Sequence, residues 1–222
     1  LDPATRGSLY HKALEIAVGR AINASDIRAA TLEHIDEAFA EAEADPKVAL
    51  PVVPNWESER ADQIQELKKA SRAADFISDG ARVVGVEVAF EAVHEGLRFS
   101  GSIDRVDDTS SGLIAIDYKT SSSKPLGAKD RNGQLNVDVQ IPLYANVALR
   151  ELYPSGNYGD SSYYSLTKGK ILRTEQEGDL QRLNELIDDV NAILSDGAFA
   201  VDPDARESGC QYCELDAVCR TG

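Results

Sequence analysis

The sequence of 222 residues contains no methionine, one tryptophan and only three cysteines. It has no apolar run of the length that spans a bilayer, and it does not begin with the basic, apolar-centred pattern of a secretion signal. We therefore expect a cytoplasmic protein without a membrane partner. Basic residues are also scarce, with 23 Lys and Arg against 38 Asp and Glu and a net charge of −15. This excess of negative charge argues against an extended surface that binds duplex DNA. Any contact with nucleic acid is expected to be local.

The three cysteines, Cys210, Cys213 and Cys219, all lie close to the end of the chain. Three cysteines cannot pair evenly, and such clustering in a chain without a secretion signal indicates a metal site rather than a disulfide framework. The absence of methionine from a chain that begins at Leu1 predicts a piece of a longer polypeptide.

The residues that are present predict helices first and a sheet afterwards. Apolar spacing predicts helices over 7–23, 29–44 and 56–78. From Ala81 the period becomes two, which places Val84, Val86, Val88 and Phe90 on one face of a strand and Glu87 and Glu91 on the other. A hairpin, a helix over 137–152, strands over 161–168 and 170–174 and a helix over 179–194 follow. We expect a single α/β domain, with a helical part over 1–80, a core over 81–200 and a cysteine tail over 201–222.

The stretch "GSIDRVDDTSSGLIAIDYKT" predicts the hairpin, two strands joined by a polar turn. Because side chains alternate along a strand, Asp117 and Lys119 project to one side, while Ile114, Ile116 and Tyr118 project toward a core. A pair of opposite charges two residues apart is compatible with a solvated face. On these two residues alone we favour that interpretation, and a cleft at the end of the strand is the alternative.

The carboxylates of Asp104 and Asp117, taken together with His11, form a candidate set of metal ligands. Oxygen and nitrogen ligands of this kind hold Mg²⁺ or Mn²⁺, which lowers the pKa of a bound water and clamps a phosphoryl group. Lys119 would then steer or deprotonate that water.

In order along the chain, the sequence resembles the PD-(D/E)xK nuclease superfamily, and within it the RecB-like nuclease domains. "GSLYH" resembles the Gly-x-x-x-His motif, "GSIDRVD" the first acidic motif, "IDYKT" the D-x-K core and "QIPLY" the Gln-x-x-x-Tyr motif. The resemblance implies a restriction-endonuclease-like mixed sheet flanked by helices. It also implies metal ligation by His11, Asp104 and Asp117, action of Lys119 on the attacking water, and support of the site and of nucleic acid by Gln140 and Tyr144.

Each of these residues has an ordinary alternative. His11 is also compatible with an ordinary surface or core histidine of an amphipathic helix. Gln140 and Tyr144 are also compatible with a side-chain pair one helical turn apart that has no role in a site. For Glu87 we weigh support of the metal site against an ion pair with Arg105, and we favour the ion pair. We assign no role to His34 and His94.

The cysteine spacing is similar to the C-terminal segment of AddB-type helicase-nucleases and of CRISPR-associated adaptation nucleases. That resemblance implies a four-iron, four-sulfur cluster in the full-length protein. Its fourth cysteine is absent here, and zinc on three thiolates is the alternative. Lys124, Lys129 and Arg131 follow the D-x-K strand in the loop "SSSKPLGAKDRNGQ", which we expect either to track a phosphate backbone or to be a solvated loop.

The sequence thus predicts a Mg²⁺- or Mn²⁺-dependent deoxyribonuclease domain of a helicase-nuclease acting in DNA recombination and repair. The helicase would lie outside these residues, because no Gly-x-x-x-x-Gly-Lys-Ser/Thr loop occurs in them. Two alternatives remain: a catalytically silent domain that binds DNA or scaffolds a complex, and a structural metal module whose function lies in the tail.

Overall fold

The computed structural model describes residues 1–123, 128–129 and 136–197. Three helices come first: α1 (Pro3–Ala21), α2 (Ile27–Ala44) and α3 (Trp56–Arg72). Helix α1 begins where Asp2 accepts hydrogen bonds from the backbone N–H groups of Ala4 and Thr5, with Pro3 in the first turn. The predicted helix over 56–78 ends earlier, at Arg72, and Phe76 and Ile77 leave it to pack into the core.

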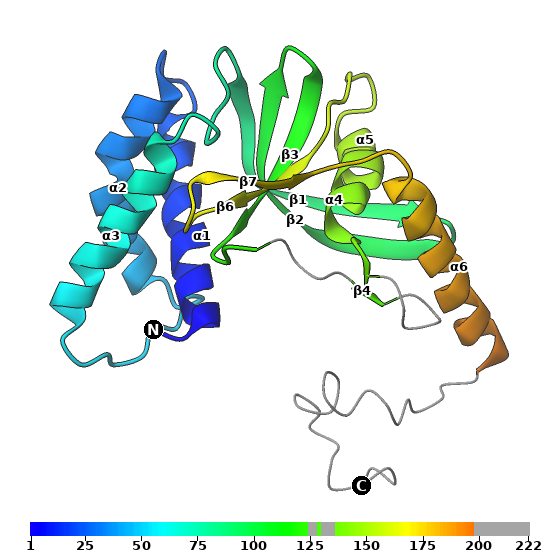
Figure 1. Ribbon diagram of the computed structural model, residues 1–222, viewed down its shortest axis with the longest axis horizontal. Coiled ribbons are helices and arrows are strands. Elements are labelled where there is room, and N and C mark those ends of the chain that lie inside the picture. Colours follow the sequence, from blue (N-terminus) through cyan, green and yellow to red (C-terminus); the bar gives the residue numbers. More distant parts are fainter. Residues whose placement is uncertain (124–127, 130–135, 198–222) are drawn as a thin grey trace, which may run out of the picture.

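A five-stranded mixed sheet follows, in the order β1-β2-β3-β6-β7 (Figure 1). Its strands are β1 (Arg82–His94), β2 (Leu97–Thr109), β3 (Gly112–Lys119), β6 (Ser162–Ser165) and β7 (Lys170–Thr174). Strands β2 and β3 form the predicted hairpin, and β6 runs parallel to β3 with Lys119 opposite Ser165. The short strands β4 (Ala128–Lys129) and β5 (Asn136–Val137) pair separately.

The predicted helix over 137–152 consists of α4 (Gln140–Leu143) and α5 (Leu149–Leu152), joined by the π-helical turn Tyr144–Ala148. The last described helix is α6 (Asp179–Asp196). Figure 1 shows α1–α3 on one side of the sheet and α4–α6 on the other. The expected class is therefore confirmed: an α/β fold with N-terminal helices and a mixed sheet flanked by helices, as in restriction endonucleases.

Two hydrophobic clusters hold these layers together. One packs α1–α3 against a sheet face that includes Ile116, Tyr118 and Tyr164. The other packs α6 and the α4–α5 helix against the opposite face, which includes Ile103 and Ala115. Alternation along β3 is thus as the sequence predicts. Among the described helices, none combines the length and apolar character needed to cross a membrane.

Candidate active site

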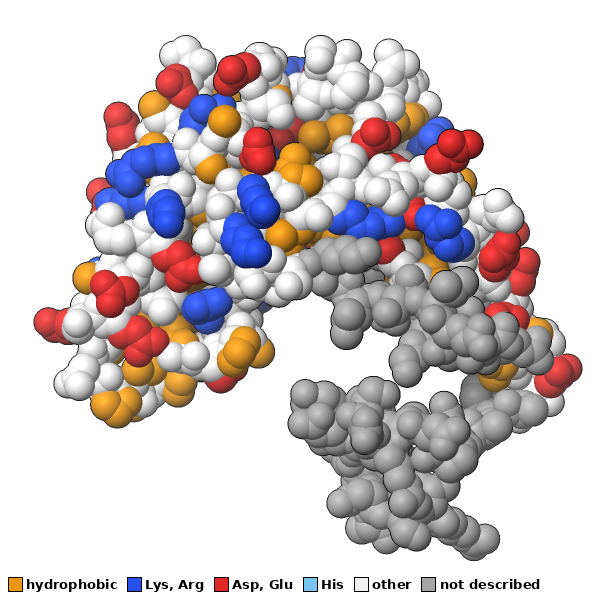
Figure 2. Space-filling model, viewed as in Figure 1, with side chains coloured by type: hydrophobic (Ala, Val, Ile, Leu, Met, Phe, Trp, Pro, Cys, Tyr) orange, Lys and Arg blue, Asp and Glu red, His pale blue; other side chains and the backbone are white. Residues whose placement is uncertain are grey.

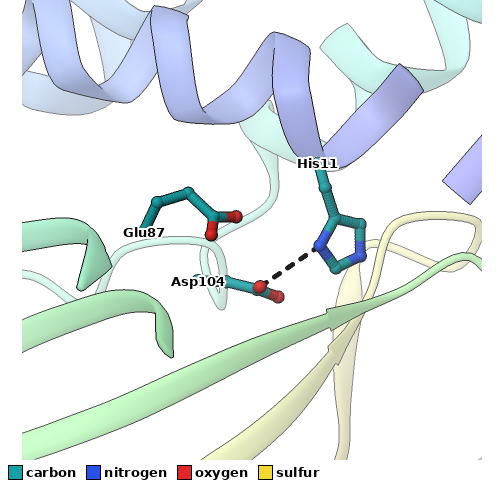
Figure 3. Close-up of side chains that lie close together, drawn as sticks. All are labelled: His11, Glu87 and Asp104. Atoms are coloured by element: carbon teal, nitrogen blue, oxygen red, sulfur yellow. Dashed lines mark hydrogen bonds and ion pairs between the residues drawn. The ribbon is translucent and has the colours of Figure 1, made fainter. Parts of the chain in front are cut away.

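His11, Glu87 and Asp104 converge from α1, β1 and β2 (Figure 3). Their ligand atoms all lie within 4.8 Å of one another, and His11 Nδ1 is 3.2 Å from Asp104 Oδ1. These three are the one group of at least three metal-ligating side chains found in the described part of the chain. Asp117 does not belong to this group.

A kink shared by β1 and β2 positions Glu87 and Asp104. Val86 packs with the α1–α3 cluster and Val88 with the opposite one, although strict alternation would put both on the same face. The backbone at Glu87, between them, has a φ of 46°, which non-glycine residues rarely adopt. The prediction that Val84, Val86, Val88 and Phe90 share a face is therefore wrong at Val86.

Close packing supports the kink. A side chain at Gly85 would approach Val88 Cγ2 to 2.4 Å, which explains why this strand position has none. On β2, Ile103 and Val106 are three residues apart and yet belong to the same cluster. Alternation is thus broken on both strands at the level of Glu87 and Asp104, and the two carboxylates reach the histidine.

The favoured ion pair between Glu87 and Arg105 is also wrong. Glu87 accepts a hydrogen bond of 2.8 Å from Ser102 Oγ. The Arg105 side chain is only 1 % exposed and forms two 2.8 Å hydrogen bonds with Asp107 instead. Because β2 has lost its simple alternation, side-chain spacing did not reveal on which face Arg105 lies.

Arg105 connects the two strands of the site to Phe76, in the segment that follows α3. Its guanidinium donates to Tyr118 Oη at 2.7 Å and to the carbonyl of Phe76. The Tyr118 N–H in turn donates to Asp104 Oδ2 at 2.6 Å. This buried network fixes Asp104 on β2 against β3, the strand that carries Asp117 and Lys119.

Asp117 and Lys119 form the second part of the site. Lys119 Nζ lies 2.6 Å from Asp117 Oδ2 and donates a 2.9 Å hydrogen bond to Gln140 Oε1. Nζ also lies 5.1 Å from the ring centroid of Tyr163, a contact that the sequence did not suggest. Although Lys119 is this close, Asp117 Oδ2 is buried without a hydrogen bond of acceptable geometry to any described residue.

Gln140 and Tyr144 link the two parts. Gln140 Nε2 donates to Tyr144 Oη at 3.0 Å, and Tyr144 Oη donates to the Ser102 carbonyl at 2.9 Å. Since Ser102 Oγ holds Glu87, one hydrogen-bonded chain connects Lys119 with Glu87. The i, i+4 pair is therefore present, and it extends to Lys119 at one end and to β2 at the other.

Crowded negative charge perturbs the titration of these groups. Burial raises the pKa of Asp117 to about 6, and the charge of Asp104 adds to this against the opposing charge of Lys119. Burial likewise raises the pKa of Glu87, again with a contribution from Asp104. Burial disfavours the charged ring of His11, but its hydrogen bond to Asp104 and the nearby carboxylates outweigh this, so its pKa is raised. A cation at this place would relieve the repulsion between the carboxylates.

The donor set fits a divalent ion. Carboxylate oxygens suit Mg²⁺ and Mn²⁺, and an imidazole beside them suits the softer Mn²⁺. The buried Oδ2 of Asp117, which already lies 2.6 Å from the Lys119 ammonium, is a further oxygen for which a cation would be a partner. His11, Glu87 and Asp104, with Asp117 beside them, are thus the residues that would hold such an ion.

Glu87 belongs to the site, although the sequence analysis favoured an ion pair of this residue with Arg105. The available signal was a lone carboxylate within the apolar strand "VVGVEVAF", two residues after a glycine. The other assigned residues, Lys124, Arg131, Cys210, Cys213 and Cys219, lie outside the described residues, as does the side chain of Lys129.

The fold and this site define the class: an α/β protein of the restriction-endonuclease type with acidic, histidine and lysine side chains gathered beside its central hairpin. The family model described as the PD-(D/E)XK nuclease superfamily matches residues 1–220. The chain belongs to this superfamily. No curated protein and no solved structure matches it.

Proposed function

We propose that the protein is a divalent-metal-dependent DNA nuclease that hydrolyses phosphodiester bonds. The observation that carries the proposal is the meeting of the His11, Glu87 and Asp104 group with the Asp117–Lys119 pair through one hydrogen-bonded chain. Membership of a nuclease superfamily supports it. Asp104, Asp117 and Lys119 are all present, and a silent domain has no chemical need for all three.

In this reaction a water oxygen attacks phosphorus, an ester P–O bond breaks, and the leaving oxygen takes up a proton. A bound Mg²⁺ or Mn²⁺ supplies water activation and neutralises charge on the phosphoryl oxygens. The carboxylates and His11 would hold that ion. Lys119 Nζ would orient the attacking water and, in its uncharged form, accept the proton that this water loses, which then passes to the leaving oxygen. Positioned proton transfer of this type contributes roughly 10²- to 10⁴-fold in rate.

Gln140 and Tyr144 act on Lys119 rather than on the substrate. The amide oxygen of Gln140 accepts from Nζ, and Tyr144 fixes which way the amide points. Burial raises the pKa of Tyr144 to about 12, so its hydroxyl remains a neutral donor to the Ser102 carbonyl. An ordered lysine loses little freedom on reaching the transition state.

The test compares Asp117→Asn and Lys119→Met with Asp108→Asn and Lys47→Met. The two control residues lie outside the site, Asp108 in an ion pair with Arg82 on β1 and Lys47 exposed between α2 and α3. Cleavage of labelled single-stranded and duplex DNA with Mn²⁺ should fall at least about 100-fold in both site variants and stay unchanged in the controls.

Mn²⁺ affinity separates the roles of the two residues. Asp117→Asn should weaken binding, whereas Lys119→Met should retain it. Normal turnover in both site variants, or wild-type protein that binds Mn²⁺ and DNA without cutting, would contradict the proposal. The second result would favour a silent DNA-binding domain.

We also propose that the domain works within a helicase-nuclease of the RecB or AddB type. The motif order and the spacing of Cys210, Cys213 and Cys219 support this. In the full-length protein the three thiolates would be ligands of a four-iron, four-sulfur cluster. Iron analysis and the visible spectrum of that protein test the assignment, and stoichiometric zinc without iron would overturn it.

A further inference from the structure

Four basic side chains lie at the junction of α3 and the β6–β7 turn. Lys69 and Arg72 are on the last turn of α3, and Lys168 and Lys170 are on or beside the turn 166–169. All four are exposed, and none forms an ion pair with a residue that the structure describes. Figure 2 shows lysine and arginine side chains over α3 and over β6 and β7. We call these four residues the basic junction.

The two elements of the basic junction are packed tightly together. Tyr164 Oη donates to the Ala70 carbonyl at 2.8 Å. A side chain at Gly169 would approach Ala73 Cβ to 3.3 Å and Ala70 Cα to 3.5 Å, so only glycine allows this contact without displacement. The four cations are therefore carried on one rigid surface, although about a hundred residues separate the two pairs in sequence.

The basic junction lies at the same sheet edge as the active site. Strands β3 and β6 are parallel, so their carboxyl ends share that edge. The Leu166 N–H donates to the Lys119 carbonyl at 2.8 Å, and Thr167 Oγ1 donates to the Thr120 carbonyl at 2.7 Å. The turn that carries Lys168 thus begins in direct contact with the backbone of the proposed catalytic lysine.

The local structure accounts for two of these four cations. Lys69 and Arg72 stabilise the C-terminal end of a helix through its dipole, so they need no ligand. Lys168 and Lys170 have no such partner. In a chain of net charge −15, four cations gathered on one surface attract a polyanion to that surface more strongly than single cations elsewhere do.

We propose that the basic junction binds the phosphate backbone of the DNA strand that enters the active site. This inference rests on the proposed function, since the adjoining site selects a phosphodiester chain as the occupant. The four side chains are all lysine or arginine, with no aromatic platform among them. Binding should therefore be strong in low salt and independent of base sequence.

The test measures binding and chemistry separately. Binding of a fluorescein-labelled oligothymidylate is followed by anisotropy in EDTA over a series of KCl concentrations. The variants are Lys168→Glu/Lys170→Glu and Lys69→Glu/Arg72→Glu. The matched control is Lys47→Glu/Arg98→Glu. It reverses the same number of exposed charges, on the α2–α3 loop and on β2, and neither side chain forms an ion pair within the described part of the chain.

Each basic-junction variant should raise Kd about tenfold or more, and lose about 1.4 units from the slope of log K against log salt, because two phosphate contacts of a single strand disappear. The control should leave the slope unchanged. Hydrolysis of bis(p-nitrophenyl) phosphate with Mn²⁺ should be the same in all proteins, since so small an ester cannot reach the basic junction.

The two proposals fail in different ways. If neither the small ester nor DNA is hydrolysed while the binding pattern holds, the nuclease proposal fails and the basic junction is supported. If the basic-junction variants match the control in Kd and slope, the basic junction is overturned, whether or not the protein cuts DNA. Far-ultraviolet circular dichroism establishes that each variant is folded.

Discussion

At the scale of single residues, Asp117 has a charge that costs stability. Its pKa is raised to about 6 in the folded chain, above the ordinary value of 3.8. An acid with a raised pKa binds more protons in the folded state, so its contribution to stability falls as pH rises between about 4 and 6 and stays low above that range. In the proposed metal site, the carboxylate would face a cation, which would offset this cost.

Replacing Asp117 by Asn should therefore stabilise the metal-free protein. At pH 8 in EDTA we expect the free energy of unfolding to rise by on the order of 1–3 kcal/mol, the equivalent of the shift. At pH 4 the two proteins should be nearly equal, because the carboxyl is then protonated. Urea unfolding across this pH range checks the prediction, and an unchanged or lower stability of the variant at pH 8 would contradict it.

At the scale of elements, the kink in β1 and β2 turns two carboxylates toward α1. Glu87 has a φ of 46° in the middle of a strand, and Glu95 has a φ of 47° in the hairpin turn that joins the same two strands. A residue with a side chain in this conformation is strained by roughly 1–2 kcal/mol, and glycine is not. Glu95 is exposed and lies in the turn at the end of β1, so it serves as a control for the same backbone conformation outside the site.

Glu87→Gly and Glu95→Gly should both retain or raise the stability of the metal-free protein, by up to about 1 kcal/mol. Only Glu87→Gly should weaken Mn²⁺ binding, because only Glu87 lies beside His11 and Asp104. Thermal unfolding and Mn²⁺ titration of both variants test this. A loss of stability confined to Glu87→Gly with unchanged Mn²⁺ affinity would make Glu87 a structural residue held by Ser102.

The buried Arg105–Asp107 ion pair is a second feature of these strands that stabilises the site. It joins Phe76, in the segment after α3, to Tyr118, the residue between Asp117 and Lys119. Arg105→Met should destabilise the protein by about 3–5 kcal/mol, because it leaves the buried Asp107 carboxylate unpaired. Arg105→Met combined with Asp107→Leu should recover part of that loss. Strictly additive losses in a denaturant double-mutant cycle would mean that the two residues do not stabilise each other.

At the scale of the whole molecule, the proposed ion would join α1 to the sheet, since His11 comes from one and the carboxylates from the other. Two hydrophobic clusters already pack helices on both sheet faces, so we expect the fold to form without metal. We expect the protein to remain folded in EDTA. Mn²⁺ at a hundred times its Kd should stabilise it by about 2.7 kcal/mol.

Thermal unfolding with and without Mn²⁺, in the wild type and in Asp104→Asn, measures this coupling. The wild type should show the stabilisation and the variant should lose most of it. Complete unfolding in EDTA would instead favour the alternative in which the chain is a structural metal module.

By itself, the sequence determined the order and type of the longer elements, but not the short strands β4 and β5. Helix and strand periods are local properties, and hydrophobic spacing therefore predicted α1, the β2–β3 hairpin and the opposite faces of β3. It also placed Asp117 and Lys119 together, because residues two apart on a strand share a face whatever the rest of the chain does.

Only the tertiary structure decided which partners these residues meet. Glu87 contacts Ser102 and approaches His11 rather than Arg105, because the backbone at Glu87 adopts a left-handed conformation that breaks the alternation of β1. The basic junction joins two pairs of cations from distant parts of the chain through the packing of Gly169 on α3. Local spacing does not identify the partners in either arrangement, since each depends on contacts between segments that come together only when the chain folds.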